Sequence, residues 1–189
     1  PSRIVIAAGS LYLSTDYAET LPRVSAVPNP LCVAIAPGAP SSIYVGTGFG
    51  DGILKSSDGV TWQPKNLGLP TFGEMINPIL SLAVDPSDPQ TIWAGTQYSG
   101  GVLVSHDGGD HWQGKGLTES NFVGAIAVHP QDSNQILVGA GYSNGTIYKS
   151  RNGGASWQVA ISDIGFVEDI VYGQDPRWVY AATEGSGVW

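Results

Sequence analysis

The sequence is poor in cysteine, in charge and in long apolar runs. Its only cysteine, Cys32, excludes an intrachain disulfide. Charged residues make up 13% of the 189 positions, and 16 acidic against 8 basic side chains leave a formal net charge of −8. Such a surface repels phosphate backbones and acidic lipids, so we expect no nucleic-acid partner. No apolar run approaches the roughly 20 residues that span a bilayer, so we expect no membrane insertion.

Glycine and hydrophobic residues, by contrast, are abundant. The chain has 26 glycines, and 42% of its residues are hydrophobic. This balance favours a compact β protein with many tight turns and argues against disorder. The low lysine content and the frequent Trp, Ser, Thr and Gly are typical of secreted bacterial proteins, so we expect a secreted or periplasmic location.

A short serine-led pattern occurs four times along the chain. We call these segments the first to fourth anchors, and they occupy residues 14–21, 56–62, 105–112 and 150–157. The third contains Ser, Asp, Gly and Trp in order, and the fourth has Asn in place of Asp. The second is one residue shorter, and the first has lost both Gly and Trp. A period of roughly 40–50 residues is typical of propellers and solenoids.

The surroundings of the anchors predict the fold. Three short β-type segments separated by turns precede each full anchor, and the Trp opens a fourth. Four short strands per repeat describe a propeller blade, and no stretch shows sustained helical periodicity. We therefore predict an all-β fold, a β-propeller of four-stranded antiparallel blades. The repeats are about 1–23 (partial), 24–70, 71–115, 116–160 and 161–189 (partial).

The inner strands should lie near residues 32–36, 80–84, 124–128 and 168–172. A propeller needs ring closure to remove its edge strands, and the sequence leaves two ways to close. The chain is a section of a larger propeller, whose remainder would be a partner, or the two partial terminal blades pair and close a small ring.

The anchors resemble the Asp-box (BNR) repeat, whose consensus is Ser-x-Asp-x-Gly-x-Thr-Trp. The superfamily includes sialidases, xyloglucan-cleaving glycosidases, sortilin-like receptors, photosystem assembly factors and lectins. The resemblance implies that the anchors lie on the outer rim, opposite the ligand face. Turn chemistry gives them a structural role, because Asp, Asn and Ser bond to backbone N–H groups, Gly takes positive φ and Trp covers the hairpin. The predicted structural residues are Ser56, Asp58, Trp62, Ser105, Asp107, Trp112, Ser150, Asn152 and Trp157.

Loops between the second and third strands of each blade supply the candidate ligand-binding residues. Three of these loops carry an aromatic residue at the same place, and polar residues lie nearby. Such aromatics stack on sugar rings or pack on the adjacent hairpin, and both interpretations remain open. The candidates are Phe49, Asp51, Tyr98, Tyr142, Asn144 and Glu184.

Three acids are weak candidates for catalysis. Glu74, Glu119 and Glu168 each precede or begin a predicted inner strand, near the expected channel mouth. A pair of carboxylates there could act as acid and base in glycoside hydrolysis, or bind calcium. The alternative is that they are solvated loop acids. The histidines and the single cysteine predict no metal site and no other cofactor.

Two functions follow from these residues. The first is a non-catalytic binding or scaffold propeller with a carbohydrate or protein ligand. The alternative is a glycoside hydrolase of the xyloglucanase type, or a fragment of one. A sialidase is disfavoured because Arg3, Arg23, Arg151 and Arg177 do not form the arginine cluster that such enzymes need.

Overall fold

A computed structural model describes residues 4–24, 26–38, 41–185 and 187–188. Within these ranges the regular structure consists of short β-strands and one 3-10 turn, Tyr98–Gly100. No helix among the described residues is long and apolar enough to cross a membrane. The prediction of an all-β fold is therefore confirmed.

Three antiparallel sheets have four strands each, in chain order, and form complete blades. The second blade contains β4 (Pro30–Ile35), β5 (Ile43–Thr47), β6 (Ile53–Ser56) and β7 (Gln63–Pro64). The third contains β10 (Ile79–Val84), β11 (Ile92–Thr96), β12 (Val102–Ser105) and β13 (Gln113–Gly114). The fourth contains β14 (Val123–Val128), β15 (Ile136–Ala140), β16 (Thr146–Ser150) and β17 (Gln158–Ile161).

Two three-stranded sheets flank the complete blades. The first blade contains β1 (Ile4–Ala7), β2 (Leu11–Ser14) and β3 (Arg23–Val24). The fifth contains β18 (Val167–Tyr172), β19 (Val179–Thr183) and β20 (Gly187–Val188). Within the described ranges, no strand of the first blade pairs with a strand of the fifth.

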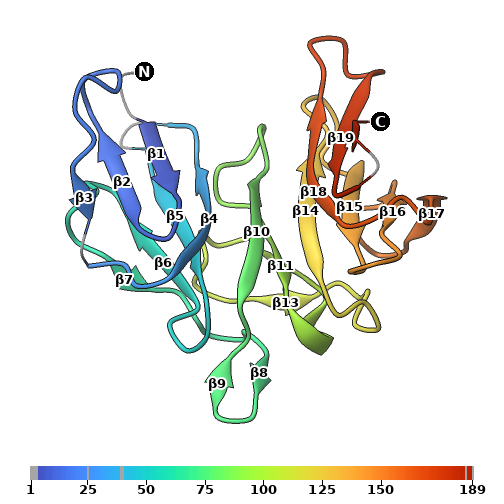
Figure 1. The fold of residues 1–189 in the computed structure, drawn as a ribbon, viewed down its shortest axis with the longest axis horizontal. Coiled ribbons are helices and arrows are strands. Elements are labelled where there is room, and N and C mark those ends of the chain that lie inside the picture. The colour runs from blue at the N-terminus through green and yellow to red at the C-terminus, as the bar shows by residue number, and fades with distance from the viewer. Residues whose placement is uncertain (1–3, 25, 39–40, 186, 189) are drawn as a thin grey trace.

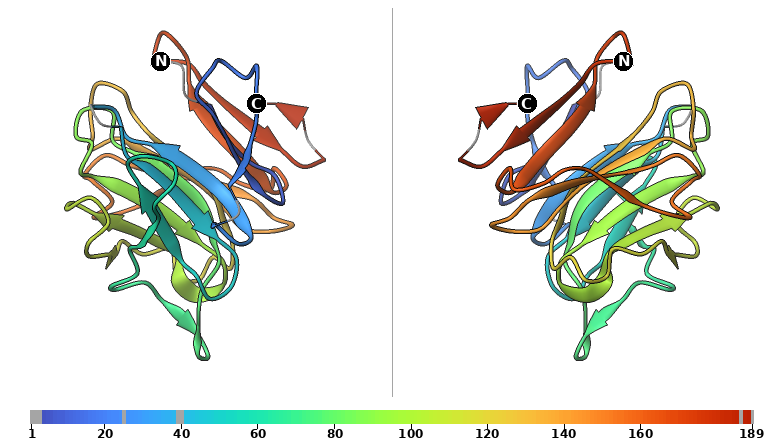
Figure 2. Two further views of the ribbon diagram at one scale, coloured as in Figure 1. Left: turned by 90° about the vertical axis from the view of Figure 1, so that its left-hand side faces the viewer. Right: turned by 90° about the vertical axis from the view of Figure 1, so that its right-hand side faces the viewer.

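The blades follow one another around an arc. Strands β4, β10, β14 and β18 contact one another in that order, and β1 contacts β4 (Figures 1 and 2). Each of β4, β10, β14 and β18 begins its sheet, so these are the inner strands that the repeat predicts. The arrangement confirms a β-propeller with three full and two partial blades.

A two-stranded hairpin interrupts the repeat before the third blade. It consists of β8 (Thr71–Phe72) and β9 (Met75–Ile76), and it projects from the arc (Figure 1). We did not predict it, because it adds residues between the second and third anchors without any periodic pattern. Its extra length accounts for the wider spacing of those two anchors.

Hydrophobic cores lie between neighbouring blades. Tyr44 and Ile53 of the second blade, for example, pack with Ile79 and Ile92 of the third, and all four side chains are fully buried.

The close approach of the blades depends on one recurrent glycine in the second strand. A Cβ on Gly95 would lie 2.6 Å from the Val123 side chain, and one on Gly139 would lie 2.5 Å from Val167. Gly46 meets Ile79 in the same way. These contacts let the second strand of one blade press against the first strand of the next.

Candidate functional site

The third and fourth anchors form the same hydrogen-bonded turn. Ser105 Oγ accepts the N–H of Gly109 at 2.8 Å and donates to the Asp107 carboxylate at 2.7 Å. Asp107 also accepts the backbone N–H of His111 at 2.9 Å. The Ser105 hydroxyl and His111 hold the pKa of the Asp107 carboxyl well below its usual range. In the fourth anchor Asn152 takes the place of Asp107, and the equivalent bonds measure 2.9 and 3.0 Å. The serine hydroxyls and the Asp107 and Asn152 side chains therefore make their hydrogen bonds within their own turns.

The first anchor keeps this turn although it has lost its glycines. Ser14 Oγ accepts the N–H of Ala18 at 2.8 Å, and Asp16 accepts the N–H of Thr20 at 3.1 Å. Tyr17 and Ala18 adopt φ values of 64° and 69°, which glycine adopts far more readily. The hydrogen bonds to Ser14 and Asp16 therefore maintain the turn even though Tyr17 and Ala18 disfavour positive φ.

The second anchor has a tighter turn because it lacks one residue. Gly59, only three positions after Ser56, donates to its hydroxyl at 2.8 Å, and Asp58 accepts the N–H groups of Val60 and Thr61 at 2.8 Å each. These bonds lower the pKa of Asp58 to about 2. The buried indole N–H of Trp62 has no hydrogen-bond partner among the described residues.

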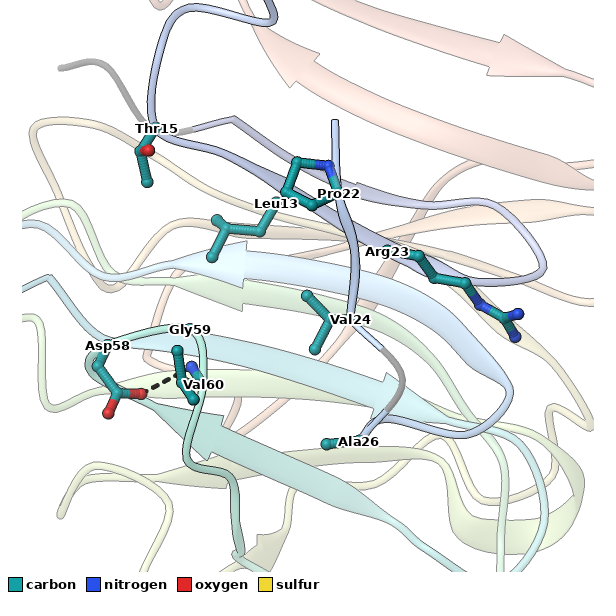
Figure 3. Close-up of a pocket in the computed structure, with 9 residues that line it drawn as sticks. All are labelled: Leu13, Thr15, Pro22, Arg23, Val24, Ala26, Asp58, Gly59 and Val60. Carbon is teal, nitrogen blue, oxygen red and sulfur yellow. Dashed lines mark hydrogen bonds between the residues drawn. The ribbon is translucent and has the colours of Figure 1, made fainter. Parts of the chain in front are cut away.

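A hollow of about 400 Å³ lies between this second anchor and the first blade (Figure 3). Leu13, Val24 and Val60 make much of its lining apolar, with Arg23 and Asp58 among the lining residues. Since Asp58 is bonded within its turn, the hollow offers few groups that could orient a ligand. We attribute it to the packing of the shortened turn.

The loops between second and third strands emerge at the other end of the sheets, together with the segments that enter each blade. Their first N–H groups bond back to the segment that enters the same blade. Gly48 donates to Asn29, Gln97 to Pro78, Gly141 to Phe122 and Glu184 to Phe166, at 2.8–2.9 Å. The same bond thus repeats in the second to fifth blades, and we call the end of the sheets that carries these loops and entering segments the loop face.

One aromatic group on the loop face joins the second and third blades. We call Phe49, Phe72 and Tyr98 the first aromatic cluster. The rings of Phe72 and Tyr98 stack with centroids 4.7 Å apart, and Phe49 lies 5.8 Å from Tyr98. Phe72 is 57% and Phe49 42% exposed. Tyr98 takes a φ of 58°, and its N–H donates to Asn121 of the segment that enters the fourth blade.

A second aromatic group joins the fourth and fifth blades. We call Phe122, Tyr142 and Phe166 the second aromatic cluster. Tyr142 lies 4.9 Å from Phe122 and 6.2 Å from Phe166, and it is 64% exposed. The predicted aromatic residues Phe49, Tyr98 and Tyr142 therefore pack on neighbouring rings, and Phe49 and Tyr142 are also exposed to solvent.

A cavity of about 400 Å³ brings several predicted residues together. Its lining includes Tyr142 and Phe122 of the second aromatic cluster, with Glu119, Asn121 and Asn144. Apolar rings and a few polar groups in one hollow are the usual features of a ligand site. The cavity unites Glu119, Tyr142 and Asn144 of the sequence candidates.

The other predicted acids lie apart from this cavity. Glu74 lies in the exposed turn between β8 and β9, in the segment that leads into the inner strand β10. The unpredicted hairpin therefore separates it from that strand, and its place at a channel mouth stays a prediction. Glu168 lies within β18, beside a register shift, and is exposed. Asp51 and Glu184 are exposed loop residues, and the Asp51 carbonyl accepts a bond from Asn66.

Metal-binding residues do not converge in the described part of the chain. No group of three or more His, Cys, Asp or Glu side chains there could hold an ion. His106 lies 3.0 Å from the Thr91 hydroxyl, and His111 Nδ1 lies 2.6 Å from Asp107. Cys32 is partly buried beside the inter-blade core, and burial raises the pKa of its thiol to about 12.

Sequence reasoning missed half of the aromatic residues on the loop face. Phe122 and Phe166 each stand directly before a buried Val that opens an inner strand, and this recurrent Phe-Val pair could have identified them. Phe72 belongs to the inserted hairpin and has no counterpart in the other repeats. No pattern in the sequence indicates that it stacks on Tyr98.

No protein-family model matches the chain, and no curated protein sequence is significantly similar to it. Solved structures are similar in fold. Nidogen in a nidogen/laminin complex superposes with a TM-score of 0.71 at 13% identity, over 97% of this chain and 70% of that one. YCF48 bound to D1 peptide gives 0.63 at 14%, over 95% of this chain and 56% of that one. An ancestral GH74 enzyme gives 0.61 at 22%, over 86% of this chain and 22% of that one.

These likenesses concern architecture, since all three identities are below 25%. The chain spans less than half the length of the first GH74 chains that it matches. The matched proteins include enzymes as well as proteins solved with a protein or peptide partner, so a shared fold does not select among their activities. The geometry and the comparisons agree on one conclusion: the chain has the β-propeller fold.

Proposed function

We propose that this chain is a non-catalytic Asp-box propeller whose loop face binds a protein or carbohydrate ligand. The observation that carries the proposal is the pair of partly exposed aromatic clusters on that face. Aromatic rings held by neighbouring rings are rigid platforms, so a ligand that stacks on them loses little further freedom with them. The cavity beside Tyr142 adds polar groups that would orient such a ligand.

The distribution of carboxylates supports binding over catalysis. Glycoside hydrolysis requires two carboxyl groups separated by roughly 5–10 Å across the scissile bond. Among the residues that line the cavity beside Tyr142, only Glu119 has a carboxylate. The other candidates, Glu74 and Glu168, lie on the projecting hairpin and on an inner strand.

The likeness to propellers solved with a partner is consistent with a protein ligand. YCF48 was solved with a peptide and nidogen with laminin. The two clusters lie on the loop face at separate blade junctions and would contact an extended segment at two places, and two weak contacts on one ligand reinforce each other.

Binding to peptide and glycan arrays tests the proposal. For a ligand found with the wild type, Tyr142→Ala should weaken binding about tenfold, because it removes the most exposed ring of the second aromatic cluster. Phe72→Ala should weaken it through the first cluster. Tyr17→Ala is the matched control, since Tyr17 is 80% exposed in the first anchor at the opposite end.

Hydrolysis assays on β-glucans complete the test. Glycan cleavage that is lost in Glu119→Gln would contradict the non-catalytic assignment. Binding that is the same in wild type, Tyr142→Ala and Phe72→Ala would remove the loop face as the site.

A further inference from the structure

The segments that make up the loop face contain acidic side chains but no basic ones. These segments are the four loops, 47–52, 96–101, 140–146 and 183–185, and the entering segments, 26–31, 66–79, 116–123 and 162–167. Their acids are Asp51, Glu74, Glu119, Asp163 and Glu184. All 8 Lys and Arg residues of the chain lie outside these ranges. Lys115 is the nearest in sequence, and its N–H still bonds to Val102 in the sheet at 2.7 Å.

The carboxylates of the loop face differ from those of the anchors in the contacts that they make. Asp107 is bonded within its turn, and Asp110 forms an ion pair with Lys65. Four exposed carboxylates of the loop face accept no hydrogen bond and form no ion pair among the described residues: Asp51, Glu74, Glu119 and Glu184. Their negative charge is therefore available to a ligand.

Two of these acids accompany the first aromatic cluster. Asp51 and Glu74 each follow a ring of that cluster by two positions. The N–H of Gly50 donates to the carbonyl of Ile76 at 3.3 Å, so the loop that carries Asp51 contacts the hairpin that carries Glu74. Exposed rings and unpaired carboxylates thus lie on two touching segments.

The cavity beside Tyr142 combines the same two kinds of group in one hollow. Its lining includes the rings of Phe122, Tyr142 and Tyr148 and the carboxylate of Glu119, and no basic residue. A guanidinium or ammonium group is attracted both to the face of an aromatic ring and to a carboxylate. A neutral sugar could stack on these rings, but it would leave the carboxylate without a partner. The lining therefore favours a cation.

The two aromatic clusters are connected through the segment that enters the fourth blade. Gln97 and Phe122 form an antiparallel β-bridge, and the N–H of Tyr98 donates to the carbonyl of Asn121. Tyr98 belongs to the first cluster and Phe122 to the second, so the clusters are linked by neighbouring residues. An extended polypeptide could contact both, whereas a single small cation would occupy only the cavity.

We propose that the loop face binds an extended segment of another protein through Arg or Lys side chains of that segment. One cationic group would lie in the cavity beside Tyr142, against Glu119, and a second would lie at the first aromatic cluster, near Asp51 and Glu74. This inference rests on the proposed function, and it selects a basic polypeptide over a carbohydrate.

Fluorescence anisotropy with labelled peptides tests the charge of the ligand. The probe is a peptide of alternating Arg and Ser, and the matched control peptide has Gln in place of every Arg. We expect the Arg peptide to bind at least about tenfold more tightly than the Gln peptide. Sodium chloride at about 0.5 M should remove most of this difference, because salt screens exposed charges. Equal affinity of the two peptides at low salt would overturn the inference.

Substitutions test the place of binding. Glu119→Gln and Tyr142→Ala should each weaken binding of the Arg peptide about fivefold, whereas Tyr142→Phe keeps the ring and should retain the wild-type affinity. Glu19→Gln is the matched control, because Glu19 is an exposed acid of the first anchor that forms no ion pair among the described residues. Equal weakening by Glu19→Gln and Glu119→Gln would overturn the site, since the peptide would then respond only to net charge.

A double variant tests the second contact. Asp51→Asn combined with Glu74→Gln should also weaken binding of the Arg peptide about fivefold. Unchanged binding in this variant would overturn the contact at the first aromatic cluster.

Glycan and neutral-peptide arrays separate this inference from the proposed function. A glycan or neutral peptide that Tyr142→Ala no longer binds, together with no binding of the Arg peptide, would overturn the basic partner and leave the loop face as a binding site. If no ligand, the Arg peptide included, depends on Tyr142 or Phe72 for binding, both the inference and the proposed function are overturned.

Discussion

The third and second anchors form the same kind of serine- and aspartate-bonded turn, but the second is one residue shorter. In the third, the extra glycine brings a carbonyl to Tyr44 and Lys55, and the Trp112 indole N–H donates to Lys65 O at 2.8 Å. In the second, Trp62 has no such bond and a hollow lies between the turn and the first blade. Both turns keep their internal serine and aspartate bonds. The internal bonds therefore define the turn, whereas its length determines how well the blade docks on its neighbour.

Truncating the two tryptophans gives the largest expected contrast. Trp112 is 4% exposed and hydrogen-bonded, so Trp112→Ala should lower the free energy of unfolding by about 3–5 kcal/mol. Trp62→Ala should cost roughly half as much, because Trp62 is only partly buried and its N–H makes no bond to lose. Denaturant titration of both variants measures the difference. Equal losses would show that the shortened anchor docks as well as the full one.

Exchanging glycine and alanine at equivalent turn positions should give a smaller effect of opposite sign. Gly109 and Ala18 both donate their N–H to the anchor serine, and both have positive φ. Gly109→Ala should destabilise the protein by roughly 1–2 kcal/mol, and Ala18→Gly should stabilise it by up to about 1 kcal/mol. Thermal unfolding of the two variants provides the measurement. A loss of stability in Ala18→Gly would mean that the first anchor is not strained.

The smallest expected difference between the anchors lies in how the free energy of unfolding depends on pH. The turn bonds lower the pKa of Asp107, and they lower those of Asp16 and Asp58 to about 2. A carboxylate with a lowered folded-state pKa stabilises the protein above its unfolded value, near 3.9, and that contribution is lost as the pH falls toward 2.

Two substitutions at equivalent positions test this dependence. Asp107→Asn should flatten the fall in unfolding free energy between about pH 4 and pH 2, since Asn152 already shows that an amide can make the turn bonds. Asn152→Asp should steepen the fall. Denaturant titrations across that pH range measure both slopes, and unchanged slopes would contradict the assigned role of the carboxylates.

Repetition explains how much of the fold could be predicted. The second, third and fourth anchors each follow three strands in the same order, so the spacing of Asp58, Asp107 and Asn152 was sufficient for the blades and for their inner strands. The β8–β9 hairpin could not be predicted in this way, because an insertion has no copy elsewhere with which to compare it. The position of Glu74 in the turn of this hairpin could not be predicted for the same reason.

The candidate site was predictable only where it repeats. Phe49, Tyr98 and Tyr142 share a position in successive loops, and all three lie on the loop face. Their stacking partners come from other segments, and the partner of Tyr98, Phe72, belongs to the inserted hairpin. Contacts between different blades depend on tertiary geometry, which loop composition does not encode.

The glycine in the second strand of each complete blade has a consequence for the whole ring. Gly46, Gly95 and Gly139 each leave space for the first residue of the next inner strand. The absence of a Cβ at these positions therefore sets how closely neighbouring blades pack, and with it the angle between them. The fifth blade has Ala182 at this register position. A sheet that packs beyond it would stand farther off than the sheets within the arc, so the curvature of the ring would change at that junction.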